Sequence, residues 1–298
     1  MSNRGFTLEV PPGGFHPMPF PKNLRSSSSP TGVEDRVSLE DADLIGVMGD
    51  IHGDLIHALQ VLRIFADRGI RAVIQLGDFG VIWPGENWQV SLRDLSRALT
   101  RNGQTLYFVD GNHDYHPRIL GYPIDENGYR WVSWNVAHLP RGFRTQVGKS
   151  HVLAALGGAN STDRDLRSEN VDWWPTEQIS EDDLTALGTK PVDVLVGHES
   201  PILYVRDPDP RVPPEIMEYA RQSNEMFRRA VVQTRPQITF GGHYHLHRDQ
   251  IEEFSATTPL HVRSVVLDMN GNDRVSQAIL DPKTLEIEFL LRNGTPVP

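Results

Sequence analysis

The stretch LIGVMGDIHG, residues 44–53, combines a short apolar run with two polar side chains that follow it. The apolar part predicts a buried strand, and Asp50 and His52 come just after its end. Side chains two positions apart in extended backbone point to the same side, so both residues can reach one metal ion. The stretch therefore predicts a strand that carries metal ligands at its carboxyl end.

The same pattern continues through the first half of the chain. The predicted elements are a helix over 54–68, a strand over 71–76 that ends at Asp78, a helix over 89–101 and a strand over 105–109 that ends at Asn112. Strands that alternate with helices in this way predict parallel pairing with right-handed crossovers. Reactive groups in such sheets collect at the carboxyl ends of the strands, which is where these polar residues fall.

The second half is richer in strands. Strands are predicted over 151–156, 192–196, 238–240, 262–267, 275–280 and 285–290, and one helix is predicted over 215–232. Pro213 and Pro214 precede that helix, and proline is well tolerated in a first helical turn. Residues 206–214 contain too many prolines for regular structure, so we expect a loop there.

Five short polar blocks lie at or just after strands, at residues 49–53, 77–78, 111–114, 197–198 and 242–245. A Gly-Asp or Gly-His pair alone is more often a turn than a ligand pair. The fixed order, the placement at strand ends and the two doubled pairs favour a site for two adjacent divalent metals. The candidate ligands are Asp50, His52, Asp78, Asn112, His198, His243 and His245, with His113 as a further histidine.

The composition limits the kind of protein. The chain has 298 residues, a hydrophobic fraction of 38% and a formal net charge of −10. It has no cysteine, which excludes thiolate metal sites, so His, Asp, Glu or Asn must hold a metal. Proteins that bind long nucleic acid usually have a basic surface, and this chain has no Lys/Arg-rich run. The composition therefore favours a small phosphorylated substrate over a polymer.

Residues 1–40 differ from the rest of the chain, with PPGG at 11–14, SSSSP at 26–30 and no periodic apolar pattern. We predict an extended or disordered N-terminal arm over 1–40 and one α/β domain over 41–298. An arm packed on the domain is the alternative. The N-terminus has no apolar signal core, and no apolar run approaches the length of a membrane span. We therefore expect a cytoplasmic protein without a membrane partner.

The order of the blocks resembles the calcineurin-like metallophosphoesterase superfamily. The matching motifs span 49–245, and the predicted strands extend the likeness further in both directions. The stretches GDFGVIW at 77–83, GGA at 157–159 and WWP at 173–175 are similar to a branch found in bacteria and phages. The resemblance implies an α/β fold in which a two-sheet β-sandwich is flanked by helices, with the metals above the strand ends.

By this resemblance, two divalent ions share Asp78. One ion would be held by Asp50, His52, Asp78 and His245, and the other by Asp78, Asn112, His198 and His243. A bridging hydroxide attacks phosphorus in line, and His113 protonates the leaving oxygen or steadies the phosphate. Asn112 and His113 are the expected substrate contacts. Mixed oxygen and nitrogen ligands suit Mn²⁺, which we expect, and also Fe²⁺ or Zn²⁺.

One departure from the superfamily is informative. The phosphoprotein phosphatase branch has an aspartate and an arginine shortly after its Gly-Asp, and here residues 79–82 read FGVI. This argues against a protein Ser/Thr phosphatase and leaves His113 without its usual orienting partner. Asp114, adjacent in sequence, is the candidate for that catalytic role. Arg164 and Arg167 follow a predicted strand end, where an arginine could meet a substrate phosphate or form a salt bridge.

The expected function is metal-dependent hydrolysis of a phosphodiester, with small nucleotides, including 2′,3′-cyclic ones, as the substrate class. A phosphomonoesterase or a nuclease with the same metal site are the enzymatic alternatives. A non-catalytic metal-binding interaction module is the alternative of another class. The sequence carries no signal for an oligomeric state.

Overall fold

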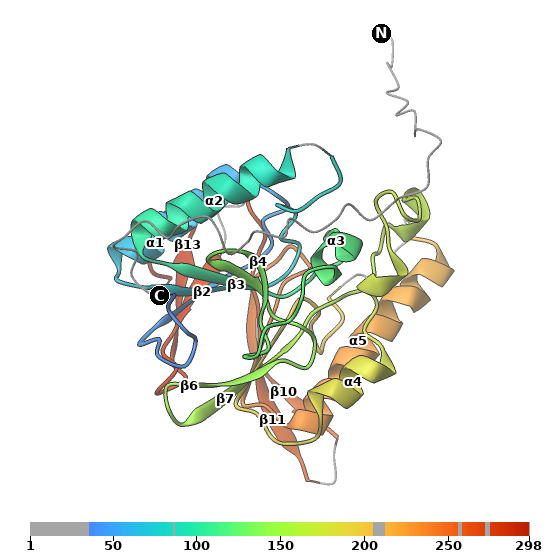
Figure 1. The fold of residues 1–298 in the computed structure, drawn as a ribbon. Coiled ribbons are helices and arrows are strands. Elements are labelled where there is room, and N and C mark those ends of the chain that lie inside the picture. The colour runs from blue at the N-terminus through green and yellow to red at the C-terminus, as the bar shows by residue number, and fades with distance from the viewer. Residues whose placement is uncertain (1–35, 86, 205–211, 256–257, 272–274, 298) are drawn as a thin grey trace. The chain divides into compact units, whose positions relative to one another are not determined.

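The computed structural model describes residues 36–85, 87–204, 212–255, 258–271 and 275–297 (Figure 1). Most of the expected arm, residues 1–35, lies outside the described residues. Residues 36–40 are irregular but contact the domain: the Val37 N–H donates to Thr105 Oγ1 at 3.0 Å, and Leu39 is fully buried. The described part of the chain holds no helix that is both long enough and apolar enough to cross a membrane.

The first half of the chain alternates strands and helices as the sequence predicts. Its elements are β1 (Ile45–Met48), α1 (Leu55–Asp67), β2 (Ala72–Gln75), α2 (Trp88–Asn102), β3 (Thr105–Phe108), α3 (His116–Leu120), β4 (Arg130–Ser133), β5 (Val136–His138) and β6 (Arg144–Val147). The helices over 54–68 and 89–101 and the three strands are confirmed. The short strands β4, β5 and β6 had no counterpart in the sequence prediction.

The second half supplies most of the second sheet, the last two strands of the first sheet and two helices. Its elements are β7 (His151–Leu156), α4 (Glu181–Leu187), β8 (Val194–Gly197), α5 (Pro214–Thr234), β9 (Ile238–Gly241), β10 (Arg248–Phe254), β11 (Leu260–Val266), β12 (Val275–Leu280) and β13 (Ile287–Leu291). Short 3-10 turns lie at Arg164–Leu166 and Pro175–Glu177. The strand β10 and the helix α4 were not anticipated.

The strands form two sheets. The first has the order β13-β12-β1-β2-β3-β5-β4, and the second has the order β10-β11-β9-β8-β7-β6. In the first sheet β1, β2, β3 and β5 are parallel, and in the second β7, β8, β9 and β11 are parallel. The antiparallel strands lie toward the edges of each sheet.

Three apolar cores lie between four layers. Alternate residues of β1 face opposite ways, so Ile45 and Val47 enter the core between the sheets, whereas Met48 packs beneath α1 and α2. A third core holds α4 and α5 against the second sheet, with Phe227 fully buried in it. Helices therefore cover the outer face of each sheet, as Figure 1 shows. The two-sheet sandwich flanked by helices is confirmed.

Register brings the polar blocks together. Met48 of β1 lies beside Gln75 of β2, which lies beside Phe108 of β3, so these strands end at one edge. In the second sheet Val196 of β8 lies beside Phe240 of β9. The loops that follow these strands from both sheets consequently converge.

Candidate metal centre

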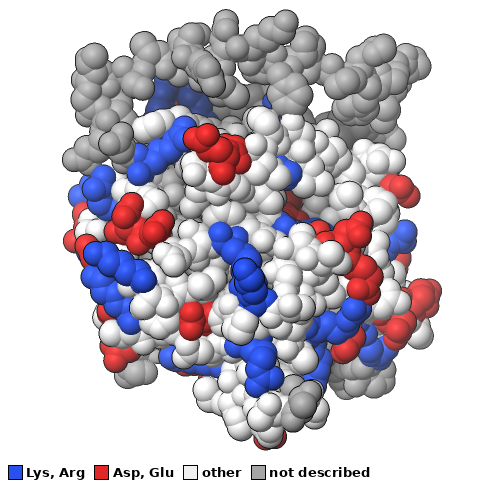
Figure 2. All heavy atoms as spheres, turned by 60° about the horizontal axis from the view of Figure 1, so that its bottom comes forward, with Lys and Arg blue, Asp and Glu red and all other residues white. Residues whose placement is uncertain are grey.

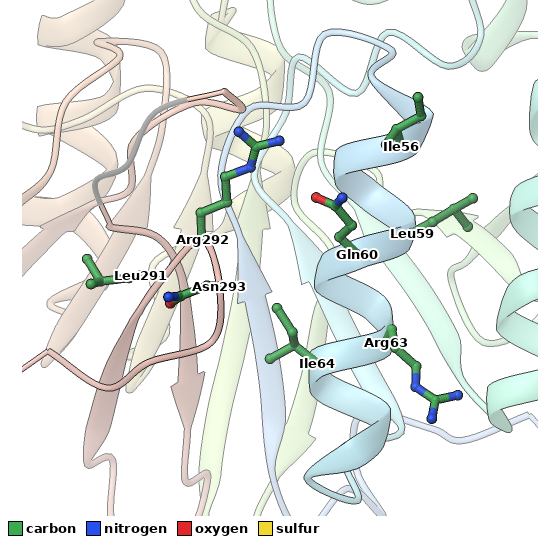
Figure 3. A pocket seen from close by; sticks show the side chains of 8 residues that line it. All are labelled: Ile56, Leu59, Gln60, Arg63, Ile64, Leu291, Arg292 and Asn293. Atoms are coloured by element: carbon green, nitrogen blue, oxygen red, sulfur yellow. The ribbon is translucent and has the colours of Figure 1, made fainter.

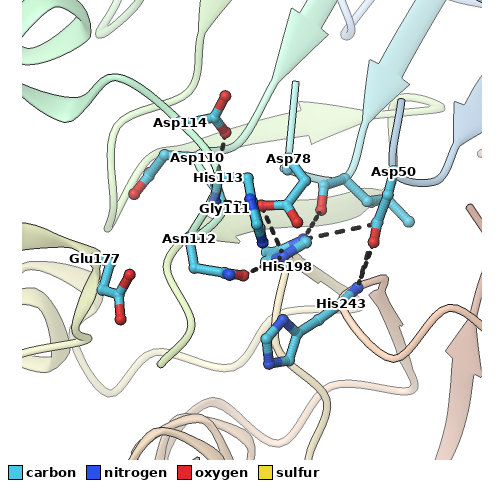
Figure 4. A network of polar contacts seen from close by, with 12 residues as sticks. Asp50, Asp78, Asp110, Gly111, Asn112, His113, Asp114, Glu177, His198 and His243 are labelled. Atoms are coloured by element: carbon cyan, nitrogen blue, oxygen red, sulfur yellow. Dashed lines mark hydrogen bonds and ion pairs between the residues drawn. The ribbon is translucent and has the colours of Figure 1, made fainter. Parts of the chain in front are cut away.

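All seven candidate ligands come from these converging loops. Asp50 and His52 follow β1, Asp78 follows β2, Asn112 follows β3, His198 follows β8, and His243 and His245 follow β9. Asp50, Asp78, Asn112 and His198 are buried, and Figure 4 shows them turned toward one another. Two sheets therefore contribute to one cluster.

Asp78 lies between two histidines. Its Oδ2 is 3.3 Å from His52 Nε2, and its Oδ1 is 3.2 Å from His198 Nε2. Ligand atoms of Asp50, His52, Asp78 and His245 all lie within 4.8 Å of one another, close enough to surround one ion. This is the first of the two ligand sets that the sequence predicts.

In the second predicted set, His198 contacts the other oxygen of Asp78 and lies next to Asn112 and His243. His198 Nε2 lies 3.0 Å from Asn112 Oδ1, and the ring centroids of His198 and His243 are 5.1 Å apart. The backbone N–H of His243 donates to Asp50 Oδ2 at 3.0 Å, which ties the loop after β9 to the end of β1. The structure thus brings the second set together around His198, whereas the ligand atoms of the first set all lie close enough to surround one ion.

Backbone and side-chain acceptors fix which ring nitrogen faces the cluster. His198 Nδ1 donates to the carbonyl oxygen of Leu76 at 2.8 Å, which leaves Nε2 as the ligand atom. His52 Nδ1 donates to Asn270 Oδ1 at 3.2 Å, and Asn270 Nδ2 donates to Asp54 Oδ2 at 3.2 Å. Sequence reasoning missed Asn270, because it lies beyond the last polar block.

A buried network orients the Asn112 amide. Asn112 Nδ2 donates to Ser161 Oγ at 3.1 Å, and Ser161 Oγ donates to Glu177 Oε2 at 2.7 Å. Tyr219 OH donates to the other Glu177 oxygen at 2.9 Å. With its nitrogen held in this way, Asn112 turns its carbonyl oxygen toward His198. Burial raises the pKa of Glu177, and the hydrogen bonds from Ser161 oppose that rise.

Glu199 holds the loop that carries His243 and His245. Tyr244 OH donates to Glu199 Oε1 at 2.5 Å, and the backbone N–H of Ser200 donates to the same oxygen at 2.9 Å. Tyr244 lies between the two histidine ligands in sequence, so this bond fixes their loop against the end of β8. No sequence pattern indicated this contact, because Glu199 and Tyr244 are 45 positions apart.

A second buried cluster supports the Gly111–Asp114 block from behind. Asp110 accepts from Arg141 Nη2 at 2.6 Å, and its other oxygen lies 3.0 Å from His138 Nε2. Burial alone would raise the pKa of Asp110, but Arg141 and His138 hold it well below its usual range. The buried carboxylate is therefore ionised, and it fixes the chain just before Asn112.

Several ligands have strained backbone. The φ angles of His52, Asp78, His243 and His245 are 45°, 51°, 67° and 51°, in the left-handed region. Such conformations cost about 1–3 kcal/mol each for residues with a Cβ and cluster at functional sites. Position 242 accepts only glycine, because a Cβ there would lie 2.0 Å from Asp50 Oδ1. The backbone conformation of these loops is therefore imposed by contacts within the cluster and not by the intrinsic φ/ψ preferences of the residues.

The electrostatics of the cluster fit cations. Burial raises the pKa of Asp50 to about 7. For His198, burial opposes the charged form, but the carboxylates of Asp78 and Asp50 outweigh it and raise the pKa to about 10. The raised pKa values mean that Asp50 and His198 retain protons in the metal-free cluster. Divalent ions that bind there can replace these protons. The donor set of carboxylate, amide and imidazole groups fits divalent ions.

His113 lies at the edge of the cluster. Its backbone N–H donates to Asp78 Oδ1 at 2.7 Å, and its ring centroid is 5.4 Å from that of His52. Arg167 Nη2 donates to His113 Nδ1 at 2.8 Å and also contacts Nε2. The side chain is therefore close to the ligands without belonging to either predicted set.

Asp114 makes different contacts from those expected of an orienting residue. Its carboxylate accepts the backbone N–H groups of Gly111 at 2.8 Å, Gly80 at 2.9 Å and Phe79 at 3.3 Å. These bonds fasten the loop after β2, which carries Asp78, to the loop after β3. The catalytic role assigned to Asp114 stays a prediction, and its contacts describe a residue that fixes loops.

A cavity of 860 Å³ lies elsewhere, between α1 and the chain at the end of β13 (Figure 3). Ile56, Leu59 and Ile64 line it from the helix, and Leu291 and Arg292 line it from the strand end. Its described lining includes none of the seven ligands. This hollow is therefore not part of the metal centre.

One family model and several solved structures are similar to this chain. The family model described as calcineurin-like phosphoesterase matches residues 44–247, which include all seven ligands. No curated protein matches the chain. One solved structure is 12% identical over 84% of this chain and 99% of its own, with a TM-score of 0.51. The protein TT1561 of Thermus thermophilus is 14% identical over 84% and 99%, with a TM-score of 0.47. A structure described as a novel archaeal phosphodiesterase is 13% identical over 83% and 99%, with a TM-score of 0.37.

Proposed function

Because the chain belongs to the calcineurin-like phosphoesterase family, we propose that it hydrolyses a phosphodiester in a metal-dependent reaction. Small nucleotides, including 2′,3′-cyclic ones, are the proposed substrate class, and a binuclear centre is the proposed catalyst. The observation that carries this proposal is the position of Asp78, whose two oxygens face His52 at 3.3 Å and His198 at 3.2 Å. A carboxylate placed in this way suits a ligand shared by two ions.

The chain's residues have separate roles in the proposed reaction. Two divalent ions, when bound, would lower the pKa of a water so that it loses a proton to solvent and can attack as hydroxide at neutral pH, and they would neutralise charge on the phosphate. Asp78 and the two ligand sets fix where that chemistry takes place. His113, beside His52, can hold a proton for the leaving oxygen or donate to the phosphate. Asn112 offers a second polar contact at the same edge.

The experiment is a substrate panel with the full-length chain. We would compare 2′,3′-cyclic nucleotides, dinucleotides, bis-p-nitrophenyl phosphate and p-nitrophenyl phosphate with added Mn²⁺, Fe²⁺ or Zn²⁺. We expect the bis ester and the cyclic nucleotides to be hydrolysed faster than the monoester, with Mn²⁺ the most effective ion. Faster hydrolysis of the monoester would favour a phosphomonoesterase instead.

Two other functions are tested by the same preparation. A nuclease would need a surface for a polymer, and on the face in Figure 2 basic and acidic side chains are interspersed. With a net charge of −10, the chain favours a small substrate. Cleavage of a labelled oligonucleotide at a rate above that of the small esters would reverse this preference. A non-catalytic module is favoured only if no ester reacts with any of the three ions.

The remaining features of the proposal concern the setting of the enzyme. We propose a cytoplasmic location, a small phosphoester or nucleotide as the substrate, and no membrane or long nucleic acid as a partner. The proposal assigns no oligomeric state. Fractionation of cells that express the tagged chain would test the location. Recovery of most of the chain in the membrane fraction would contradict the proposal.

A further inference from the structure

One buried cation contacts the proposed active site without a role in holding metal. The side chain of Arg167 is 6% exposed, and its Nη2 donates to His113 Nδ1 at 2.8 Å. The same nitrogen lies 2.9 Å from Asp163, whose side chain is 44% exposed. The guanidinium is therefore held between a half-exposed carboxylate and an imidazole at the edge of the ligand cluster.

The imidazole ring of His113 lies between Arg167 and the candidate metal ligand His52. The His113 ring stands 5.4 Å from the His52 ring, and the His113 backbone donates to Asp78. A phosphate that reaches the metal ligands must therefore come close to both His113 and Arg167. An imidazole nitrogen is a neutral acceptor, whereas a phosphate oxygen is charged and forms shorter, stronger bonds with a guanidinium. Arginine also keeps its charge at every working pH.

We propose, on the basis of the function proposed above, that Arg167 binds a non-bridging oxygen of the substrate's scissile phosphate. On binding, the guanidinium exchanges the His113 imidazole for that oxygen, while Asp163 keeps it in place. His113 is then free to face the leaving group. Phosphate recognition in this protein accordingly depends on the segment 160–178, which lies between β7 and α4 and far in sequence from the loop after β2.

The segment 160–178 is built to hold Arg167 still. Its two ends are joined at Ser161 and Glu177, where the Ser161 N–H donates to Glu177 Oε1 at 2.8 Å. Trp174 packs against Tyr115 with centroids 5.1 Å apart and against Trp83 at 5.8 Å. Through Ser161 the segment also orients Asn112. The consecutive residues Asn112 and His113 are thus both contacted by this one segment.

Arg164 provides a matched control from the same segment. Its guanidinium lies over the ring of Trp173 at 4.2 Å and near Tyr219 at 5.8 Å, instead of at His113. Arg164→Gln and Arg167→Gln remove the same charge from positions three residues apart. Only the second removes the proposed phosphate contact.

The test is a calorimetric titration of inorganic phosphate into the Mn²⁺-loaded full chain. We expect Arg167→Gln to weaken phosphate binding by about 10-fold or more, the usual effect of losing a hydrogen bond between charged groups. Arg164→Gln should bind phosphate as wild type does. Arg167→Lys, which keeps the charge but not the forked donors, should lie between the two.

Two results would overturn the assignment. One is wild-type phosphate affinity in an Arg167→Gln protein that keeps its Mn²⁺ content and melting temperature. The other is a Mn²⁺-loaded wild-type protein that binds no phosphate. The proposed function fails separately: if no ester is hydrolysed but Arg167→Gln still loses phosphate binding relative to Arg164→Gln, the arginine site stands and the catalytic proposal does not.

Discussion

The two carboxylate oxygens of Asp78 contact two different imidazoles, those of His52 and His198. The backbone of Asp78 is left-handed at this position. Around it, single contacts decide the orientation of each ligand: Leu76 for His198, Asn270 for His52 and Ser161 for Asn112. One hydrogen bond thus fixes the rotation of each of these two imidazole rings and of the Asn112 amide. Loss of one residue should therefore have a specific and separable effect.

Replacement of Asp78 by Ala should abolish metal-dependent hydrolysis, because the shared ligand of both predicted ion positions is lost. Bound Mn²⁺ should fall below two ions per chain, as measured by elemental analysis after desalting. Asp67→Ala, at an exposed position on α1, should behave as wild type. Full turnover by Asp78→Ala would show that the bridging role is misassigned.

Replacement of His113 by Ala should leave two ions bound and slow hydrolysis. A positioned general acid contributes typically about 10²–10⁴ in rate, and a loss in this range in kcat is expected. The exposed His261, paired with Glu253, supplies the control variant His261→Ala. If His113→Ala loses metal instead, the side chain is a ligand.

At the scale of elements, the site depends on loops that lie beyond the strands carrying the ligands. The turn between β11 and β12 brings Asn270 to His52, and the segment 160–178 brings Ser161 to Asn112. The contacts of Asp114 join the loops after β2 and β3 in the same manner. Each ligand loop is thus braced by another loop from a different part of the chain.

Replacement of Asn270 by Ala should lower the affinity for Mn²⁺ by about 10–100-fold, because an outer partner that orients a histidine ligand is lost. Titration of the metal-free protein with Mn²⁺ would measure the change. Asn127→Ala, at an exposed turn, is the matched control. Unchanged affinity in Asn270→Ala would mean that His52 needs no partner to face the metal.

The sequence predicted which polar residues gather at the strand ends but not the contacts that brace them, for a physical reason. Asp50, Asp78 and Asn112 follow apolar strands directly, so strand pairing alone brings them together. Asn270, Glu177 and Glu199 reach the site only through the tertiary placement of loops, which no local pattern encodes. Strands β4 and β5 were missed because RWVS at 130–133 and VAH at 136–138 are not apolar runs like the equally short β1 and β2.

At the scale of the whole molecule, the metal-free protein should lose stability as pH rises from about 7 to 9. Burial opposes the charge on His198, but nearby carboxylates raise its pKa to about 10, while the unfolded value is 6.5. The folded state then holds a proton that the unfolded state has lost, which stabilises it below pH 6.5 and is lost as pH approaches 10. Each such proton changes stability by about 1.4 kcal/mol per pH unit.

Thermal melts of chelator-treated and Mn²⁺-loaded protein at several pH values would check this. Histidines with lowered pKa values, such as His116 at about 4, are neutral in both states above pH 7 and contribute little. The loaded protein should show a smaller dependence, because cations have displaced the protons. If the melting temperature of the metal-free protein rises between pH 7 and 9, the predicted loss of stability with increasing pH is wrong.

The pairing of β1 has a consequence for how the chain is made. Asp50 stands at the end of β1, and β1 is flanked by β2 on one side and by β12, residues 275–280, on the other. During translation β1 leaves the ribosome well before β12, so one side of β1 stays open until residues 275–280 have emerged. Loop closure over so many residues is slow. The strand that positions Asp50 is therefore flanked on both sides only after all seven candidate ligands, the last of them His245, have been synthesised.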